Sequence, residues 1–148
     1  WDRLPIALAC AGLLAGLWGE THAASGRSGA WLSALLAVFA VFSVFWWYAT
    51  ELRGQGDLRC YLLLQIAPFV LVPMWQWLRG RPAAERRAFG MALLLYAAAK
   101  AAELYDHEIG RLLGGLTGHT LKHLLATAAA GVIVADLVRR SRQPARQK

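Results

Sequence analysis

Two long runs without any charged side chain limit what this chain can fold into. Residues 28–50 contain no acidic or basic residue, and residues 60–78 contain none either. A helix needs about 20 mostly apolar residues to cross roughly 30 Å of hydrocarbon, so both runs predict transmembrane helices. The composition, 57% hydrophobic over 148 residues, fits a compact domain or a bundle in a bilayer, and the two uncharged runs favour the bundle.

Three further segments bring the predicted number of transmembrane helices to five. Residues 4–19 are a shorter apolar run that can span with its flanks, and residues 88–105 and 117–138 have the length of a span. The last two contain ionisable side chains: Lys100, Glu103, His119, Lys122 and His123. We therefore predict an all-α, polytopic transmembrane bundle. Cys10 and Cys60 lie inside or at the head of predicted spans, which favours two free thiols over a disulfide.

The net charge of +7 is concentrated next to the apolar runs. Four arginines lie in residues 79–87, and five basic residues lie in residues 139–148. Basic clusters that flank spans fix membrane orientation, so we predict no nucleic-acid partner and place both segments in the cytoplasm. Residues 1–138 then form a single transmembrane domain with a basic cytoplasmic tail, 139–148, and residues 106–116 form a loop on the outer side.

A histidine pair is the strongest functional signal in the chain. His119 and His123 are four residues apart, so on a helix their imidazoles lie one turn apart on the same face, within reach of one ion. No glutamate follows the first histidine, which excludes the HExxH motif of zinc proteases. A catalytic zinc commonly has three protein ligands. By position Asp2 or His107 could be the third, whereas His22 falls on the other side of the predicted membrane.

Two other interpretations of the pair stay open. The histidines could be satisfied by hydrogen bonds within a bundle, and haem ligation is a weaker possibility, because two histidines on one helix do not normally bracket a haem. The small residues that follow favour a packed site, because they predict that the histidine face turns inward against other helices: Ala126, Thr127, Ala130 and Gly131.

Polar side chains also gather at the predicted outer end of the 88–105 segment. Spacings of three or four place them on one stripe: Tyr96, Lys100, Glu103, Asp106 and His107. Lys100 and Glu103 can pair with each other. Alternatively, Lys100, Glu103 and Asp106 orient the metal ligands by hydrogen bonding. Near the other end of the last helix, Asp136 with Arg139 and Arg140 predicts a helix-end ion pair.

Three motifs in this order resemble the bacterial branch of the alkaline ceramidase family: WDRLP at 1–5, YAAAKAAELYD at 96–106 and GHTLKHL at 118–124. That family belongs to a superfamily of seven-helix membrane hydrolases that also includes adiponectin-receptor-like proteins. The resemblance runs over essentially the whole chain. It implies that the five predicted helices are the last five of seven, so that the chain is truncated at its N-terminus.

The resemblance also implies a zinc site and a catalytic residue. In the family, zinc is held by one histidine on the second helix and an HxxxH pair on the seventh, and this pair matches His119 and His123. An aspartate at the start of the third helix matches Asp2, although Asp2 also fits a simple helix cap. The family's serine and first histidine have no counterpart here and would lie upstream of Trp1.

The activity implied by the resemblance is zinc-dependent hydrolysis of a membrane lipid, ceramide or another acyl-amide lipid, to a sphingoid base and a fatty acid. Zinc would polarise the amide carbonyl and activate water, while Asp2 would orient that water and shuttle its proton. The expected location is the bacterial inner membrane, with the site near the outer face. The alternative is a non-catalytic receptor-like or transporter-like bundle whose histidine pair binds a ligand or a metal.

Overall fold

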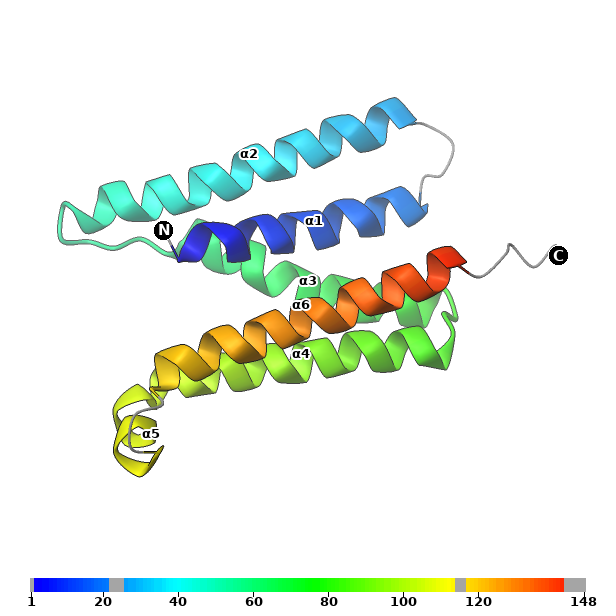
Figure 1. Ribbon diagram of the computed structural model, residues 1–148. Coiled ribbons are helices and arrows are strands. Elements are labelled where there is room, and N and C mark those ends of the chain that lie inside the picture. Colours follow the sequence, from blue (N-terminus) through cyan, green and yellow to red (C-terminus); the bar gives the residue numbers. More distant parts are fainter. Residues whose placement is uncertain (1, 22–25, 114–116, 143–148) are drawn as a thin grey trace, which may run out of the picture. The chain divides into compact units, whose positions relative to one another are not determined.

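The computed structural model describes residues 2–21, 26–113 and 117–142, and almost all of them are helical (Figure 1). The helices are α1 (Arg3–Thr21), α2 (Gly26–Glu51), α3 (Arg59–Leu78), α4 (Ala83–Leu104), α5 (Asp106–Leu113) and α6 (Gly118–Arg142). No strand occurs among these residues. The predicted all-α class is confirmed, while His22, Trp1 and residues 143–148 of the predicted tail lie outside the described residues.

Three helices are long and apolar enough to cross a membrane: α2 from Arg27, α3 and α6. A fourth candidate is the pair formed by α4 and α5, which together pass the same test but bend by 84° at their junction. The described part of the chain therefore has three to four candidate spans. The remaining predicted span, α1, is not among them.

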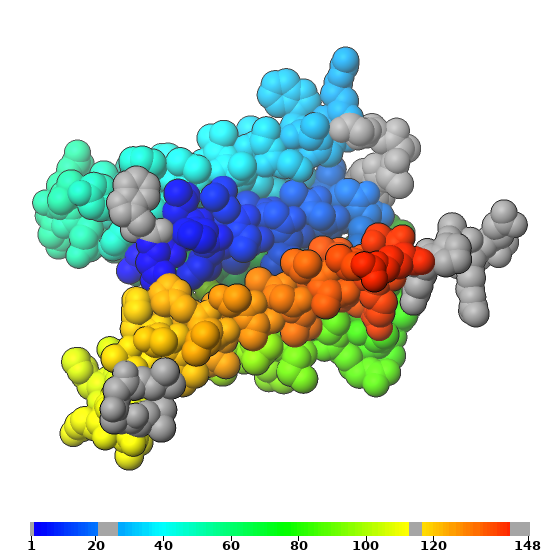
Figure 2. Space-filling model, in the orientation of Figure 1, coloured from blue at the N-terminus to red at the C-terminus, as the bar shows by residue number. Residues whose placement is uncertain are grey.

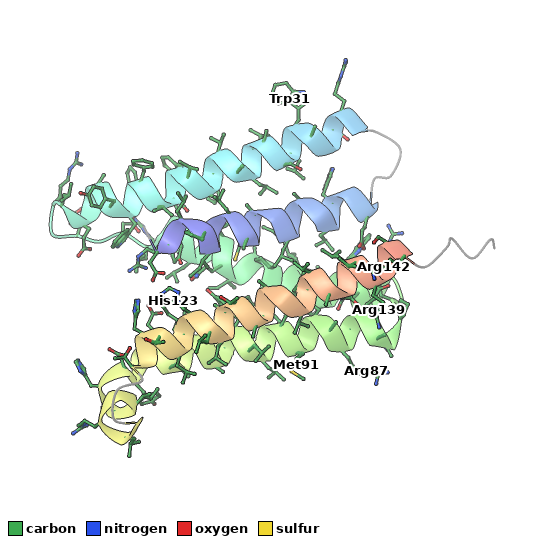
Figure 3. The ribbon with its side chains drawn as sticks, viewed as in Figure 1. Trp31, Arg87, Met91, His123, Arg139 and Arg142 are labelled. Atoms are coloured by element: carbon green, nitrogen blue, oxygen red, sulfur yellow. The ribbon has the colours of Figure 1, made fainter. Side chains whose placement is uncertain are left out.

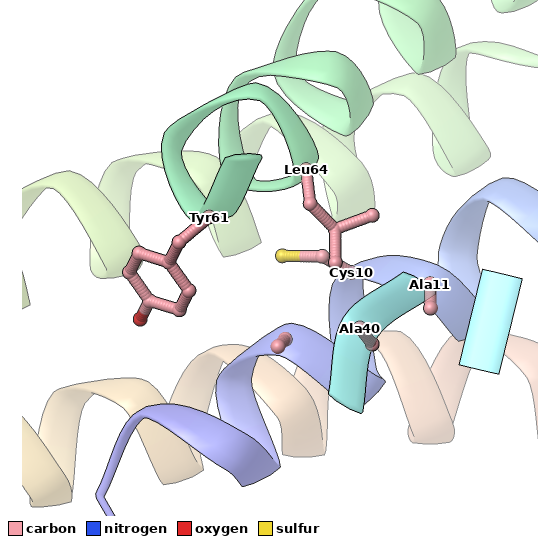
Figure 4. Packing of buried hydrophobic residues seen from close by; sticks show 6 residues of the cluster. Cys10, Ala11, Ala40, Tyr61 and Leu64 are labelled. Carbon is pink, nitrogen blue, oxygen red and sulfur yellow. The ribbon is translucent and has the colours of Figure 1, made fainter. Parts of the chain in front are cut away.

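The contacts divide the chain into two compact units, residues 1–79 and residues 80–148. In the first unit α1 packs against both α2 and α3. The buried cluster between these helices joins small side chains of α1 and α2 to larger ones of α3 (Figure 4): Ala7, Cys10, Ala11, Ala40, Tyr61 and Leu64. Alanines at the contact let the helix backbones approach closely. Cys10 and Cys60 are both free thiols, as predicted.

The turn between α2 and α3 is fixed by Asp57. Its carboxylate accepts hydrogen bonds from Arg59 Nη2 at 2.7 Å and from Trp46 Nε1 at 3.0 Å. These bonds hold the pKa of Asp57 well below its usual range. At the start of α1, the Arg3 guanidinium lies 4.1 Å from the Trp47 ring centroid, a cation–π contact.

The second unit is built on α4 and α6, which run side by side along their lengths (Figure 1). Small residues of α4, Ala92, Ala99 and Ala102, are buried in this contact. The short helix α5 lies at the end where α4 stops and α6 begins; it is yellow in Figure 2. The predicted loop at 106–116 is thus wrong over α5, whose acidic first turn and Arg111 near its end complement the helix dipole.

Candidate metal centre

The two histidines of α6 point their ring nitrogens at each other. His119 Nε2 and His123 Nε2 are 3.0 Å apart, and the ring centroids are 4.7 Å apart in an edge-on arrangement. Two zinc–nitrogen bonds of about 2.0–2.1 Å at a tetrahedral angle place the nitrogens about 3.3 Å apart, so this spacing fits one shared ion. The same geometry also allows a hydrogen bond between the rings when no metal is bound.

The described residues bring two of the predicted ligands together but no third. Across residues 2–21, 26–113 and 117–142, no group of three His, Cys, Asp or Glu side chains could hold a metal ion. His107 is exposed on α5, and Asp2 precedes α1 in the first unit. The pair itself can hold zinc as two neutral imidazoles, and a complete site needs further donors. The identity of the third ligand stays a prediction.

Two acceptors cap the helix turn that carries the pair. The Thr117 hydroxyl accepts a hydrogen bond from the Thr120 backbone N–H at 3.2 Å. Asp106 Oδ1 accepts one from the His119 backbone N–H at 2.8 Å. Both N–H groups belong to the first turn, where no partner exists within the helix. Asp106 therefore caps the backbone at His119. Its alternative role in orienting a metal ligand stays a prediction.

Gly118 lets α6 begin in close contact with the end of α4. A Cβ atom there would meet the Ala102 carbonyl oxygen and would stand 2.7 Å from the Cα of Asp106. Gly118 is buried accordingly. This close approach at Gly118 was not predicted, and its only signal in the sequence is a glycine directly before the first histidine.

A carboxylate bridges two lysines beneath the pair. Glu103 Oε2 lies 2.9 Å from Lys100 Nζ, which confirms the predicted pairing, and Glu103 Oε1 lies 3.2 Å from Lys122 Nζ. The Lys122 side chain is only 6% exposed, against 40% for Glu103. The bridge ties α6 to α4 one turn from the start of α6. Lys122 was not predicted as the second partner of Glu103, because the sequence alone does not show which face of α6 meets α4.

Both histidines are exposed, so they lie on a different face of α6 from the buried one that packs on α4; His123 is labelled in Figure 3. The residues of α6 that are buried are Gly118, Lys122, Ala129 and Asp136. His119, His123 and the small residues Thr127, Ala130 and Gly131 are exposed. Within this unit the histidine face does not meet α4, whose contact is made by Ala129. Inward packing of that face against other helices stays a prediction.

A shallow, wide-open groove runs along the histidine face. It is lined by His119, Thr120, His123, Leu124, Thr127 and Ala128. The two imidazoles supply the polar end of this groove, and small or apolar side chains supply the remainder. Such a surface can receive a ligand that has one polar group and an apolar chain.

Comparisons with known proteins give no match: no protein-family model, no curated protein and no solved structure matches the chain. The resemblance to the alkaline ceramidase family therefore rests on the sequence motifs described above.

Proposed function

We propose that this protein is part of a zinc-dependent intramembrane hydrolase that cleaves lipid amides, in the manner of a ceramidase. The observation that carries the proposal is the convergence of His119 Nε2 and His123 Nε2 on an exposed face of a helix apolar enough to cross a membrane. Ionisable side chains on membrane-spanning helices cost free energy and are rare, so this pair is a candidate functional site.

The proposed roles follow the chemistry of the side chains. His119 and His123 would hold the ion through their Nε2 atoms, and further donors would complete its coordination. Zinc, when bound, would act as a Lewis acid that polarises the amide carbonyl and lowers the pKa of a bound water. Asp2 is the proposed acid–base: its carboxylate orients the attacking water, takes its proton and passes that proton to the leaving amine.

The groove beside the pair supports a lipid substrate. Leu124, Thr127 and Ala128 continue the surface below the imidazoles, so an acyl chain that lies there would bring its amide carbonyl to the polar end. A site on a spanning helix also spares the substrate from leaving the bilayer. The proposed partner is ceramide or another acyl-amide lipid, and the products are a fatty acid and an amine such as a sphingoid base.

The proposed location is the bacterial inner membrane, with the C-terminus in the cytoplasm and the histidine pair near the outer face. The support is the bias of Arg and Lys toward residues 79–87 and 139–148. Reporter fusions after Arg87 and at the C-terminus are both expected to report the cytoplasm. A fusion that reports the outer side would invert the proposed placement.

A lipid-amidase assay tests the activity. The protein, with any residues encoded upstream of Trp1, is purified in detergent and given a fluorescent acyl-amide lipid with and without a zinc chelator. We expect chelator-sensitive hydrolysis that His119→Ala/His123→Ala abolishes. His22→Ala, which removes a histidine predicted to lie on the other side of the membrane, is the matched control and should remain active.

Two outcomes would redirect the proposal. Hydrolysis that survives both the chelator and the double substitution would exclude a zinc hydrolase site at this pair. Zinc binding without hydrolysis of any acyl-amide or ester lipid would favour the receptor-like or transporter-like alternative. His107→Ala separately tests whether that histidine is the third ligand, because the loss of a ligand lowers zinc affinity.

A further inference from the structure

The short helix α5 turns sharply away from α4 (Figure 1). The two helices bend by 84° at their junction, which is formed by Tyr105. The Tyr105 N–H donates to the Ala101 carbonyl of α4, and its carbonyl accepts from the Ile109 N–H of α5, both at 3.0 Å. Both helices are thus hydrogen-bonded up to the corner. When α4 crosses a bilayer along its normal, α5 therefore runs along the membrane surface.

The charged side chains of α5 exclude it from the hydrocarbon. Half of its eight residues are ionisable: Asp106, His107, Glu108 and Arg111. Ionisable side chains inside a bilayer are rare, and they pair with one another or face the interior of a bundle. Glu108 and Arg111 lie 4.0 Å apart, and both are exposed. α5 therefore belongs at the level of the lipid headgroups or in water.

The carboxylate at the other end of α6 shows what a sheltered charge looks like in this protein. Asp136 lies 3.0 Å from Arg140 and also pairs with Arg139, as the sequence predicted, and its side chain is almost completely shielded from solvent. The Glu108–Arg111 pair of α5 has no comparable cover. This difference supports a position of α5 outside the hydrocarbon.

One side of α5 is nevertheless apolar. Tyr105, Ile109 and Leu112 follow one another at spacings of four and three, which places them on one face. Leu112 is 83% exposed and Tyr105 60% exposed, so the described part of the protein leaves this face largely uncovered. The other face carries polar side chains: His107, Glu108 and Arg111. A helix divided in this way is typical of the boundary between headgroups and acyl chains.

The polar face of α5 points away from the α4–α6 pair. The residues of α5 that are half-buried are Asp106, Ile109 and Gly110, so this side of α5 meets the pair. On the helix, the exposed polar side chains lie roughly opposite this covered side. The apolar face shares Ile109 with the covered side. The apolar face therefore lies beside the candidate spans, and the polar face is turned away from them.

We propose that α5 is an interfacial helix whose apolar face, Tyr105, Ile109 and Leu112, rests on the acyl-chain boundary of a phospholipid bilayer. The occupant is lipid because this face begins where the candidate span α4 ends, and the bilayer is the apolar phase that surrounds a span. The polar face then meets headgroups and water.

The two neighbours of α5 hold it in this position. It follows α4 directly, and Asp106 Oδ1 accepts a hydrogen bond from the His119 backbone N–H at the start of α6. Eight residues alone would bind a membrane weakly, but a helix held at both sides needs little affinity of its own. α5 in turn holds the first turn of α6 at headgroup depth. This inference depends on the spans and is independent of the proposed hydrolase.

Spin-label accessibility in phosphatidylcholine vesicles tests the proposal. Single cysteines for nitroxide labels replace Leu112 on the apolar face or Arg111 on the polar face, in a Cys10→Ala/Cys60→Ala background. Both positions are exposed, so a label displaces no packed side chain. The ratio of oxygen to nickel-chelate collisions is expected to be roughly threefold higher at position 112 than at position 111, because oxygen enters hydrocarbon and the chelate stays in water.

Two reference labels calibrate this ratio. Leu94→Cys lies on an exposed position in the middle of α4, and Arg53→Cys lies on the exposed turn after α2. Equal ratios at positions 111 and 112, both as low as at Arg53→Cys, would place α5 in water and overturn the proposal. Equal ratios as high as at Leu94→Cys would place α5 inside the hydrocarbon and would overturn it as well.

The protein without substitutions gives an independent result. Phosphatidylcholine with a nitroxide near the headgroup should broaden the nuclear magnetic resonance signals of the Leu112 methyl groups more than a water-soluble gadolinium chelate does. Stronger broadening by the chelate would overturn the proposal even if a labelled variant failed to fold.

Discussion

Replacing Gly118 by alanine tests how the fold holds the histidine pair. A Cβ at this position meets the Ala102 carbonyl oxygen and stands 2.7 Å from the Cα of Asp106, closer than real Cβ atoms approach. Both obstacles are backbone atoms, so neither can rotate away as a flexible side chain would. The first turn of α6 must therefore move away from the corner between α4 and α5.

Two free-energy terms decide the size of this effect. Overpacking of a well-packed site typically costs about 1–3 kcal/mol. Alanine gains up to about 1 kcal/mol over glycine in a helix interior, but Gly118 is the first residue of α6, where the gain is smaller. The overpacking term therefore dominates, and we expect Gly118→Ala to lower the free energy of unfolding by about 1–2 kcal/mol.

Gly131→Ala is the matched control on the same helix. A Cβ at Gly131 has no neighbour within 4 Å, so this substitution should leave stability unchanged or raise it by up to about 1 kcal/mol. Unfolding in detergent, followed by circular dichroism, measures both variants. Hydrogen exchange at the His119 amide adds a local measurement: Gly118→Ala should speed exchange because it disturbs the bond to Asp106.

Equal stability of the two glycine variants, with unchanged exchange at His119, would contradict the predicted effect of a Cβ atom at position 118. It would mean that α6 does not begin in contact with α4, and that the capping by Asp106 does not position the pair.

Three further predictions concern named charges. Asp106→Ala should cost about 1 kcal/mol, the usual value of a lost helix cap, and should weaken zinc binding, whereas Asp106→Asn keeps an acceptor and should lose less. Glu103→Ala should lower the free energy of unfolding by about 1–3 kcal/mol, because it leaves the buried Lys122 charge without this partner. Lys122→Met should be nearly neutral, since it removes that charge and leaves Glu103 paired with Lys100. The pKa of Asp57 is lower in the folded state than in the unfolded state. Its contribution to the free energy of unfolding is therefore fully present above the ordinary pKa of about 3.9, and that contribution is lost as the pH falls below this value. Asp57→Asn should therefore flatten the acid side of the stability profile.

Each of these predictions has a result that would contradict it. The Asp106 variants should differ from each other in both melting temperature and zinc affinity, and identical values would remove the capping role. A Lys122→Met variant as unstable as Glu103→Ala would mean that the buried bridge is itself stabilising. An unchanged melting temperature between pH 5 and pH 3 in the unmodified protein would contradict the role of Asp57.

The sequence predicted the helices that depend on composition alone. The uncharged runs at 28–50 and 60–78 match α2 and α3 within two residues at each end. Such runs need no knowledge of neighbouring helices, because any chain segment of that length and apolarity forms a helix in hydrocarbon. The short helix α5 was not predicted, since its eight residues, half of them ionisable, give no signal of a span.

Around the candidate site, contacts within one helix could be predicted from the sequence, whereas contacts between helices could not. Spacing alone predicted the His119–His123 pair and the Lys100–Glu103 pair, because both lie within one helix. The bond from the His119 backbone to Asp106 joins the start of α6 to the first residue of α5, and the Lys122–Glu103 bridge joins α6 to α4. Neither could be predicted without knowing which face of α6 packs on α4.

The metal content of detergent-purified protein shows whether the histidine pair is a zinc site. Inductively coupled plasma mass spectrometry would compare the unmodified chain with His119→Ala/His123→Ala, each also with any residues encoded upstream of Trp1. We expect about one zinc per chain in the unmodified protein once its ligand set is complete, and none in the double variant. Absence of zinc from every unmodified form, or zinc retained in the double variant, would contradict a metal centre at this pair.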